Sequence, residues 1–178
     1  LSTDWEEAIQ VGEKFCITTH RRKDYLCEAD SPFDEVILDA ASQVRTRHMA
    51  WAPVTSPFCG SDTIRRIIES YLANSNESFT EGLIAGTEMH SYFFLGGSPV
   101  NFPIGPGHVK TQDLASLFNW DWAFSIRELD AIVRNSYMFS STPVFFELNK
   151  LENFDINDEL DFVLAENLLP YFASIQDQ

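Results

Sequence analysis

The stretch Met49-Ala50-Trp51-Ala52-Pro53-Val54-Thr55-Ser56-Pro57 decides the predicted fold. Its first six residues are mostly apolar, as is typical of a buried parallel strand. Apolar residues at helical spacing then predict a helix over 62–72. The run Gly82-Leu83-Ile84-Ala85 predicts the next strand. A strand, a helix and a strand in succession indicate an α/β fold with a doubly wound sheet.

The same alternation precedes this stretch. Trp5, Ala8, Ile9, Gly12 and Phe15 predict a helix, and the carboxylate of Asp4 is expected to cap it. A short strand is predicted over 16–19 and a polar loop over 21–30. Ser31 as the capping residue and Pro32 at the first helical position predict a second helix.

The pattern changes after the strand at 82–85. Residues 88–116 are rich in aromatic residues, Gly and Pro, which predicts an excursion of strands and loops. Helical order is predicted again over 127–133, a strand over 144–148 and a final helix over 158–175. The whole chain, 1–178, is therefore predicted to be a single domain with 88–116 as an insert.

Composition narrows the classes of function. The chain has 178 residues, 27 acidic against 12 basic, and a net charge of −15. This balance disfavours nucleic-acid binding, which normally needs a basic face. No apolar run reaches the length of a membrane span. The three cysteines, Cys16, Cys27 and Cys59, form no CxxC pair, which fits a reducing cytoplasm.

Asp155-Ile156-Asn157 follows the predicted strand at 144–148 and precedes the final helix. Two oxygen-bearing side chains at i and i+2 can share one Mg²⁺ ion, because this cation prefers oxygen ligands. Asp and Asn before a helix are also ordinary capping residues. Spacing alone therefore leaves a metal site and a helix cap open.

Two further segments carry polar side chains at positions suited to a ligand. Lys110-Thr111-Gln112-Asp113 combines a cation, an amide and a carboxylate, which suits a polyhydroxylated acid or a solvated surface loop. Thr55 and Ser56 follow a predicted strand, and ligands of open α/β sheets bind at the carboxyl ends of strands. Asp30 and Ser31 stand in an equivalent place before their helix.

In chain order, these segments resemble the acylneuraminate cytidylyltransferase (CMP-sialic acid synthetase) family. Ser2-Thr3-Asp4 resembles that family's STD strand end, and Ala29-Asp30-Ser31 its segment near the cytosine of CTP. Val54-Thr55-Ser56-Pro57 resembles the PTSP turn, and Lys110-Thr111-Gln112-Asp113-Leu114 the QDL loop. The segment 143–166, with Asp155-Ile156-Asn157, resembles the C-terminal signature.

The resemblance implies a Rossmann-like, three-layer α/β/α fold of the nucleotide-diphospho-sugar transferase (GT-A-like) type. A leading βαβ unit with the phosphate loop is then expected upstream of Leu1. The implied reaction transfers CMP from CTP to a nonulosonic acid with Mg²⁺, in a cytoplasmic homodimer whose 88–116 insert covers the partner's sugar site. Asp155 and Asn157 would hold the metal, and Lys110, Gln112 and Asp113 would act beside the sugar acid. Asp4, Ala29, Asp30, Ser31, Thr55 and Ser56 would line the substrate and nucleotide site.

The chain departs from the family pattern at three positions. Asn157 replaces the second Asp of an Asp-x-Asp pair, Pro53 a Gln before the PTSP turn, and Trp122 a Gly after the QDL loop. A non-catalytic remnant that acts as a binding or dimerisation module is the alternative function. Within the enzymatic hypothesis, Kdo, legionaminate and pseudaminate remain open as acids beside sialate.

Overall fold

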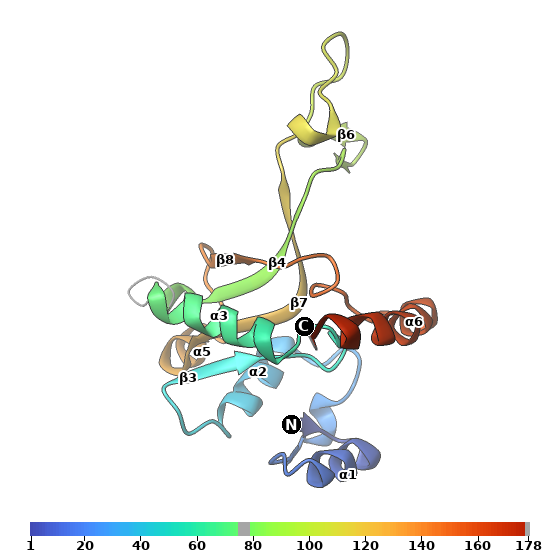
Figure 1. Cartoon of the computed structure of the whole chain (residues 1–178). Helices are drawn as coiled ribbons and strands as arrows, with labels where there is room; N and C mark the ends of the chain where they lie inside the picture. Colours follow the sequence, from blue (N-terminus) through green and yellow to red (C-terminus); the bar gives the residue numbers. More distant parts are fainter. Residues whose placement is uncertain (75–78, 177–178) are drawn as a thin grey trace. The chain divides into compact units, whose positions relative to one another are not determined.

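The computed structural model describes residues 1–74 and 79–176, and it has a mixed α/β fold (Figure 1). Two compact units are interleaved along the chain, so neither is a continuous segment. Unit 1 comprises Leu1–Trp51, Tyr71–Leu83 and Ser125–Val144, and unit 2 comprises Ala52–Ser70, Ile84–Phe124 and Phe145–Gln178. Among the described residues, no helix has both the length and the apolar character that crossing a bilayer requires.

The helices and strands follow the alternation that the sequence predicts, with one long exception in β7. In chain order they are β1 (Ser2–Thr3), α1 (Glu6–Lys14), β2 (His20–Arg21), the 3-10 helix η1 (Asp24–Leu26), α2 (Phe33–Ala41), β3 (His48–Trp51), α3 (Ser61–Ala73), β4 (Leu83–Met89), β5 (Phe94–Leu95), β6 (Ser98–Pro99), the 3-10 helix η2 (Thr111–Asp113), β7 (Leu117–Glu128), α5 (Leu129–Asn135), β8 (Val144–Glu147) and α6 (Glu159–Gln176).

The principal sheet has four strands in the order β3-β7-β4-β8. Strand β3 pairs antiparallel with β7, with His48 opposite Glu128 and Trp51 opposite Ser125. Strand β8 runs parallel to β4, because Val144 N donates to Gly82 O at 2.9 Å and Leu148 N to Gly86 O at 2.6 Å. The sheet is therefore mixed. The prediction of a parallel strand over 49–54 is wrong in direction and in its end.

Strand β7 explains this difference. The sequence predicts a helix over 127–133, but Arg127 and Glu128 end a 12-residue strand and α5 begins at Leu129. Strand β7 supplies β3 with its antiparallel partner. Aromatic and β-branched residues along 117–126 favour a strand, but the pairing depends on β3, which lies far away in the sequence.

The predicted helices α1, α2, α3 and α6 are confirmed, while the side-chain caps predicted for α1 and α2 are not. Helix α1 begins after Trp5 without a side-chain cap, so Asp4 does not cap it, and Trp5 N donates to Thr3 Oγ1 at 3.2 Å. Helix α2 begins one residue later than predicted, after Pro32. Ser31 does not cap the helix, because the residue before α2 is Pro32 and α2 has no side-chain cap; the Ser31 hydroxyl donates to Tyr25 O at 3.0 Å. The strand predicted over 16–19 lies instead at His20–Arg21, after Cys16 adopts a φ of +56°.

The core of unit 1 lies where α2 and α5 pack together. Its buried members are apolar, and burial of such side chains supplies the main driving force for folding. Nearby, His20 Nε2 lies 2.7 Å from Asp39 Oδ2 and ties β2 to α2. This hydrogen bond lowers the pKa of Asp39. The core cluster comprises Ile37, Ala41, Met49, Ile132 and Met138.

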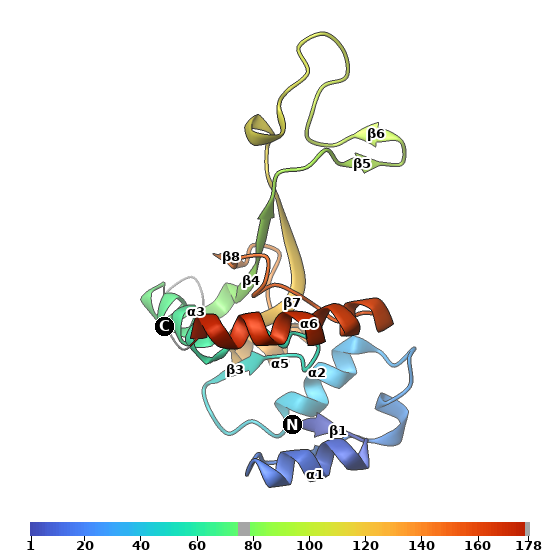
Figure 2. The same cartoon turned by 45° about the vertical axis from the view of Figure 1, so that its right-hand side comes forward.

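Unit 2 contains an arm between β4 and β7, defined as residues 90–116. Figures 1 and 2 show it extending beyond the ends of these two strands, with β5 and β6 as a small antiparallel pair. Asn101 fixes its base, since its Nδ2 donates to Ser91 O and to Ala115 O, both at 2.8 Å. The arm corresponds to the excursion that composition predicts.

Gly86 allows β4 and β7 to approach closely. A Cβ at this position would lie 2.4 Å from Asn119 O and 2.6 Å from the Phe118 ring. We expect Gly86→Ala to lower the free energy of unfolding by about 2 kcal/mol, because the backbone of β7 must move. Chemical denaturation measures this change.

Gly107→Ala, on the arm, is the matched control. Gly107 has a φ of +95°, but a Cβ at this position would meet nothing within 4 Å. Only conformational strain is expected there, about 1 kcal/mol. Equal losses for Gly86→Ala and Gly107→Ala would contradict the packing argument.

Candidate functional site

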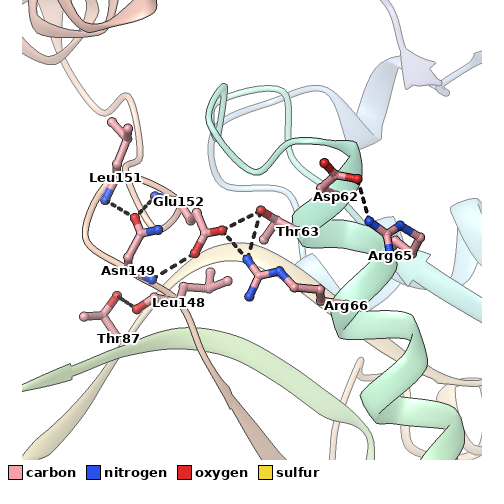
Figure 3. A network of polar contacts seen from close by, with 9 residues as sticks. All are labelled: Asp62, Thr63, Arg65, Arg66, Thr87, Leu148, Asn149, Leu151 and Glu152. Atoms are coloured by element: carbon pink, nitrogen blue, oxygen red, sulfur yellow. Dashed lines mark hydrogen bonds and ion pairs between the residues drawn. The ribbon is translucent and has the colours of Figure 1, made fainter. Parts of the chain in front are cut away.

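The loop after β8, residues 148–158, is held in place by one buried carboxylate. Glu152 Oε1 accepts a hydrogen bond from Thr63 Oγ1 at 2.6 Å and pairs with Arg66, both on α3 (Figure 3). Glu152 Oε2 accepts from Asn149 N at 3.0 Å. Because Thr63 and Arg66 both lie on α3, the loop has a fixed position against that helix.

The backbone at the entry to this loop is equally constrained. Asn149 Oδ1 accepts from Leu151 N at 2.9 Å and from Glu152 N at 3.0 Å, and Thr87 Oγ1 donates to Leu148 O at 3.1 Å (Figure 3). This geometry is an Asx turn that the sequence pattern Asn-x-x-Glu accommodates locally. It positions the residues that follow, Asn153 and Asp155.

Two sequence segments that are far apart meet at this loop. Ile156 N donates to Thr55 O at 2.9 Å. The rings of Phe58 and Phe154 pack edge to face with centroids 5.7 Å apart. The predicted ligand-binding residues Thr55 and Ser56 therefore lie beside the Asp155–Asn157 segment, as an α/β site at strand ends requires.

Asp121, on β7, lies beside the same loop. Together, Ser56, Asp121, Asn153 and Asp155 are called the Asp155 group. Asp121 Oδ2 accepts hydrogen bonds from Asn119 Nδ2 at 2.6 Å and from Asn153 Nδ2 at 3.0 Å. Burial raises the pKa of Asp121, the bond from Asn119 opposes this rise, and the negative charge of Asp155 adds to it. Two carboxylates thus lie within electrostatic reach of each other in a partly dehydrated place.

Several oxygens of this group are buried without a hydrogen-bond partner in the described part of the chain: Ser56 Oγ, Asn153 Oδ1 and Asp155 Oδ1. Leaving a buried polar atom unsatisfied costs about 1–3 kcal/mol. The Asp155 and Asn153 oxygens are acceptors, so the partner that suits both is a cation or a donor. Carboxylate and amide oxygens are the ligands that Mg²⁺ takes, so these residues fit the metal that the resemblance implies.

Asn157 differs in its surroundings from the residues that carry these buried oxygens. It is exposed, and its backbone N donates to Asp161 Oδ2 at 3.0 Å. Asp158 Oδ1 accepts from Asp161 N at 3.0 Å, so the capping side chain at the start of α6 is Asp158. Asp155 and Asn157 therefore have different surroundings, although the sequence predicts both as metal ligands.

Backbone strain marks the same strand. Trp122 has a φ of +62°, a conformation that side chains other than Gly rarely adopt, and it follows Asp121 directly. Its ring packs against that of Trp120 at a tilt of 39°, with centroids 3.8 Å apart. Trp122 therefore adopts a conformation that a Gly adopts without cost, and such strain gathers at functional sites.

The predicted sugar-site residues lie on the arm. Lys110 precedes η2, and Gln112 and Asp113 belong to it; all three are exposed. Across residues 1–74 and 79–176, no hydrogen bond or ion pair joins these side chains to the Asp155 group. Exposed Phe94, Leu95, Val100 and Ile104 lie on the same arm.

The predicted nucleotide residues Asp4, Ala29, Asp30 and Ser31 belong to unit 1. Asp4 O accepts from Arg21 Nη1 at 3.2 Å. Burial, together with the charge and a hydrogen bond of Asp4, raises the pKa of Cys27. Asp4 thus lies beside the segment that leads to Ala29 and Asp30, while the Ser31 hydroxyl is bound to Tyr25 O.

Sequence reasoning missed Asn119, Asp121, Glu152 and Asn153. Asn119 and Asp121 have the i and i+2 spacing that puts side chains on one face of a strand, and this spacing is the signal that could have found them. Glu152 and Asn153 carry no such signal. Cys59 lies near Glu152, and burial raises its pKa to about 11, with the charge of Glu152 adding to the shift. This thiol stays protonated at neutral pH and is no nucleophile.

No family model matches the chain, and no curated protein matches it.

Proposed function

We propose that this chain is the core of a cytidylyltransferase, which transfers CMP from CTP to a nonulosonic acid of the sialic type. The observation that carries the proposal is the hydrogen bond from Ile156 N to Thr55 O. It joins two segments that each resemble the family, the turn at 54–57 and the signature at 155–157. The fold would then be of the Rossmann-like, GT-A-like type.

In this reaction the anomeric oxygen of the acid attacks the α-phosphorus of CTP. A new O–P bond forms, the bond to the bridging oxygen of the β-phosphate breaks, and pyrophosphate leaves with its electron pair. The proton of the anomeric hydroxyl passes to a base or to water. A bound Mg²⁺ ion supplies charge neutralisation at the phosphates. The chain's own task is to hold both substrates in line for attack.

Different residues would bind the metal, line the floor of the site and contact the acid. Asp155 would hold the metal with its buried oxygen, and Thr55 and Ser56 would line the floor of the site. Lys110 would face the carboxylate of the acid, and Gln112 and Asp113 its hydroxyls. Because these exposed side chains lie on the arm, we propose that they act on the site of a second copy in a homodimer.

The test is pyrophosphate release from CTP and Mg²⁺ by the natural gene product that contains this chain. Sialate, Kdo, legionaminate and pseudaminate are compared as acceptors. We expect Asp155→Ala to lower kcat/KM at least about 100-fold, because charge stabilisation by a metal is worth several kcal/mol. Glu159→Gln, an exposed carboxylate at the start of α6, is expected to keep full activity.

Failure to release pyrophosphate with every acid, together with no binding of CTP in titration calorimetry, would overturn the proposal. That result would favour the non-catalytic binding or dimerisation module.

A further inference from the structure

We propose that Asp121 and Asn153 hold a divalent cation together with Asp155, in place of the Asn157 that the sequence pairs with it. The inference deepens the proposed function, on which the identity of the ion as Mg²⁺ rests.

The first proposed ligand is the amide oxygen of Asn153. This side chain is 4% exposed, and its Nδ2 is used twice, toward Asp121 Oδ2 at 3.0 Å and Asn119 O at 3.4 Å. Its Oδ1 is buried without a hydrogen-bond partner among the described residues. This oxygen needs a donor or a cation that none of the described residues provides.

The other two proposed ligands are the carboxylates of Asp121 and Asp155. Asp155 Oδ1 is also buried and unsatisfied, and Asp155 lies within electrostatic reach of Asp121. Like charges in a partly buried place repel each other, and burial of an unpaired charge is costly. No Lys or Arg pairs with either carboxylate among the ion pairs of residues 1–74 and 79–176. A divalent cation between them would satisfy the carboxylates and the amide oxygen together.

Hydrogen bonds from neighbouring residues hold these proposed ligands in place. Asn119 donates to Asp121 Oδ2 at 2.6 Å and fixes that carboxylate. The Glu152 network fixes the loop that carries Asn153 and Asp155 (Figure 3). Asn157 lies outside this set, because it is exposed and next to the capping residue of α6. Hydrogen bonds that orient the ligands are typical of metal sites.

Terbium luminescence tests the site without nucleotide or turnover. Trp120 and Trp122 flank Asp121 in the chain, so excitation of tryptophan should sensitise a Tb³⁺ ion bound there. We expect saturable luminescence that Mg²⁺ competes away. Asp121→Asn should weaken binding at least about tenfold, whereas Asn157→Ala should change it less than about twofold. Glu159→Gln removes an exposed carboxylate nearby and controls for net charge.

Thermal melting in EDTA confirms that each variant folds. Asp121→Asn relieves the repulsion with Asp155 and is expected to melt no lower than the parent protein. Equal binding by Asp121→Asn and the parent, or equal weakening by Asn157→Ala, would overturn the ligand set. If the parent protein binds Tb³⁺ as expected but shows no turnover, the proposed function is contradicted and the ligand set is not. Loss of turnover in Asp155→Ala with no role for Asp121 would contradict this inference alone.

Discussion

Replacing Glu152 by alanine is expected to lower the free energy of unfolding by about 3 kcal/mol. Glu152 is 9% exposed and binds Thr63, Arg66 and the backbone N of Asn149 (Figure 3). Removing one partner of a buried ion pair costs about 3–5 kcal/mol, because the remaining groups stay buried and unpaired. The lower end applies here, since the Arg66 side chain is 47% exposed and water screens its charge.

Urea denaturation measures the total loss, and hydrogen exchange should localise it to α3 and the loop after β8. Glu152→Gln keeps the bond to Thr63 and is expected to lose about half as much. Glu147→Ala removes an exposed carboxylate from β8 and should change stability by less than about 0.5 kcal/mol. A loss no larger than this control would mean that the network does not hold the loop.

Arg127→Met is expected to cost about 3 kcal/mol in unit 1. Arg127 is 3% exposed, and its guanidinium donates to Thr80 O at 2.7 Å, Tyr137 O at 3.1 Å and Asn135 Oδ1 at 3.0 Å. Burial lowers the pKa of Arg127, so the charge is held in a partly dehydrated place. A methionine fills similar volume but donates nothing, which leaves acceptor oxygens unsatisfied at about 1–3 kcal/mol each.

The fall in melting temperature should be on the order of 10 °C for a chain of this size. Arg127→Lys keeps the charge but lacks the planar fork, so an intermediate loss is expected. Arg134→Met removes an exposed Arg on α5 and is the control. If Arg127→Met melts like Arg134→Met, the guanidinium makes no net contribution to stability.

The sequence by itself determined the elements whose pattern is local. Ile64, Ile67, Ile68 and Tyr71 predict α3 within one residue at each end, since helical periodicity needs no distant partner. The final helix and the strand at 144–148 follow for the same reason. The α/β class is confirmed, whereas the Rossmann-like details remain a prediction.

Only the tertiary structure showed in which direction the strand at 49–54 pairs. The apolar run at 49–54 is compatible with either direction, and its antiparallel pairing is set by β7, which lies on the other side of the arm in the sequence. Helix caps failed for a related reason. In the folded loop the Ser31 hydroxyl donates to Tyr25 O, whereas as a cap its oxygen would accept from an amide of the first helical turn, and the local pattern cannot weigh the two.

Some residues of the candidate site were likewise predicted from the sequence, and others were found only in the tertiary structure. Local patterns predict Asp155 and Thr55, and the fold brings their segments together. They do not predict Asp121 and Asn153, because the importance of these residues comes from a meeting of β7 with the loop after β8. A residue's type and spacing reveal which chemistry it can perform. Which oxygens are buried together without a partner is decided by packing between distant segments, and only the tertiary structure contains that information.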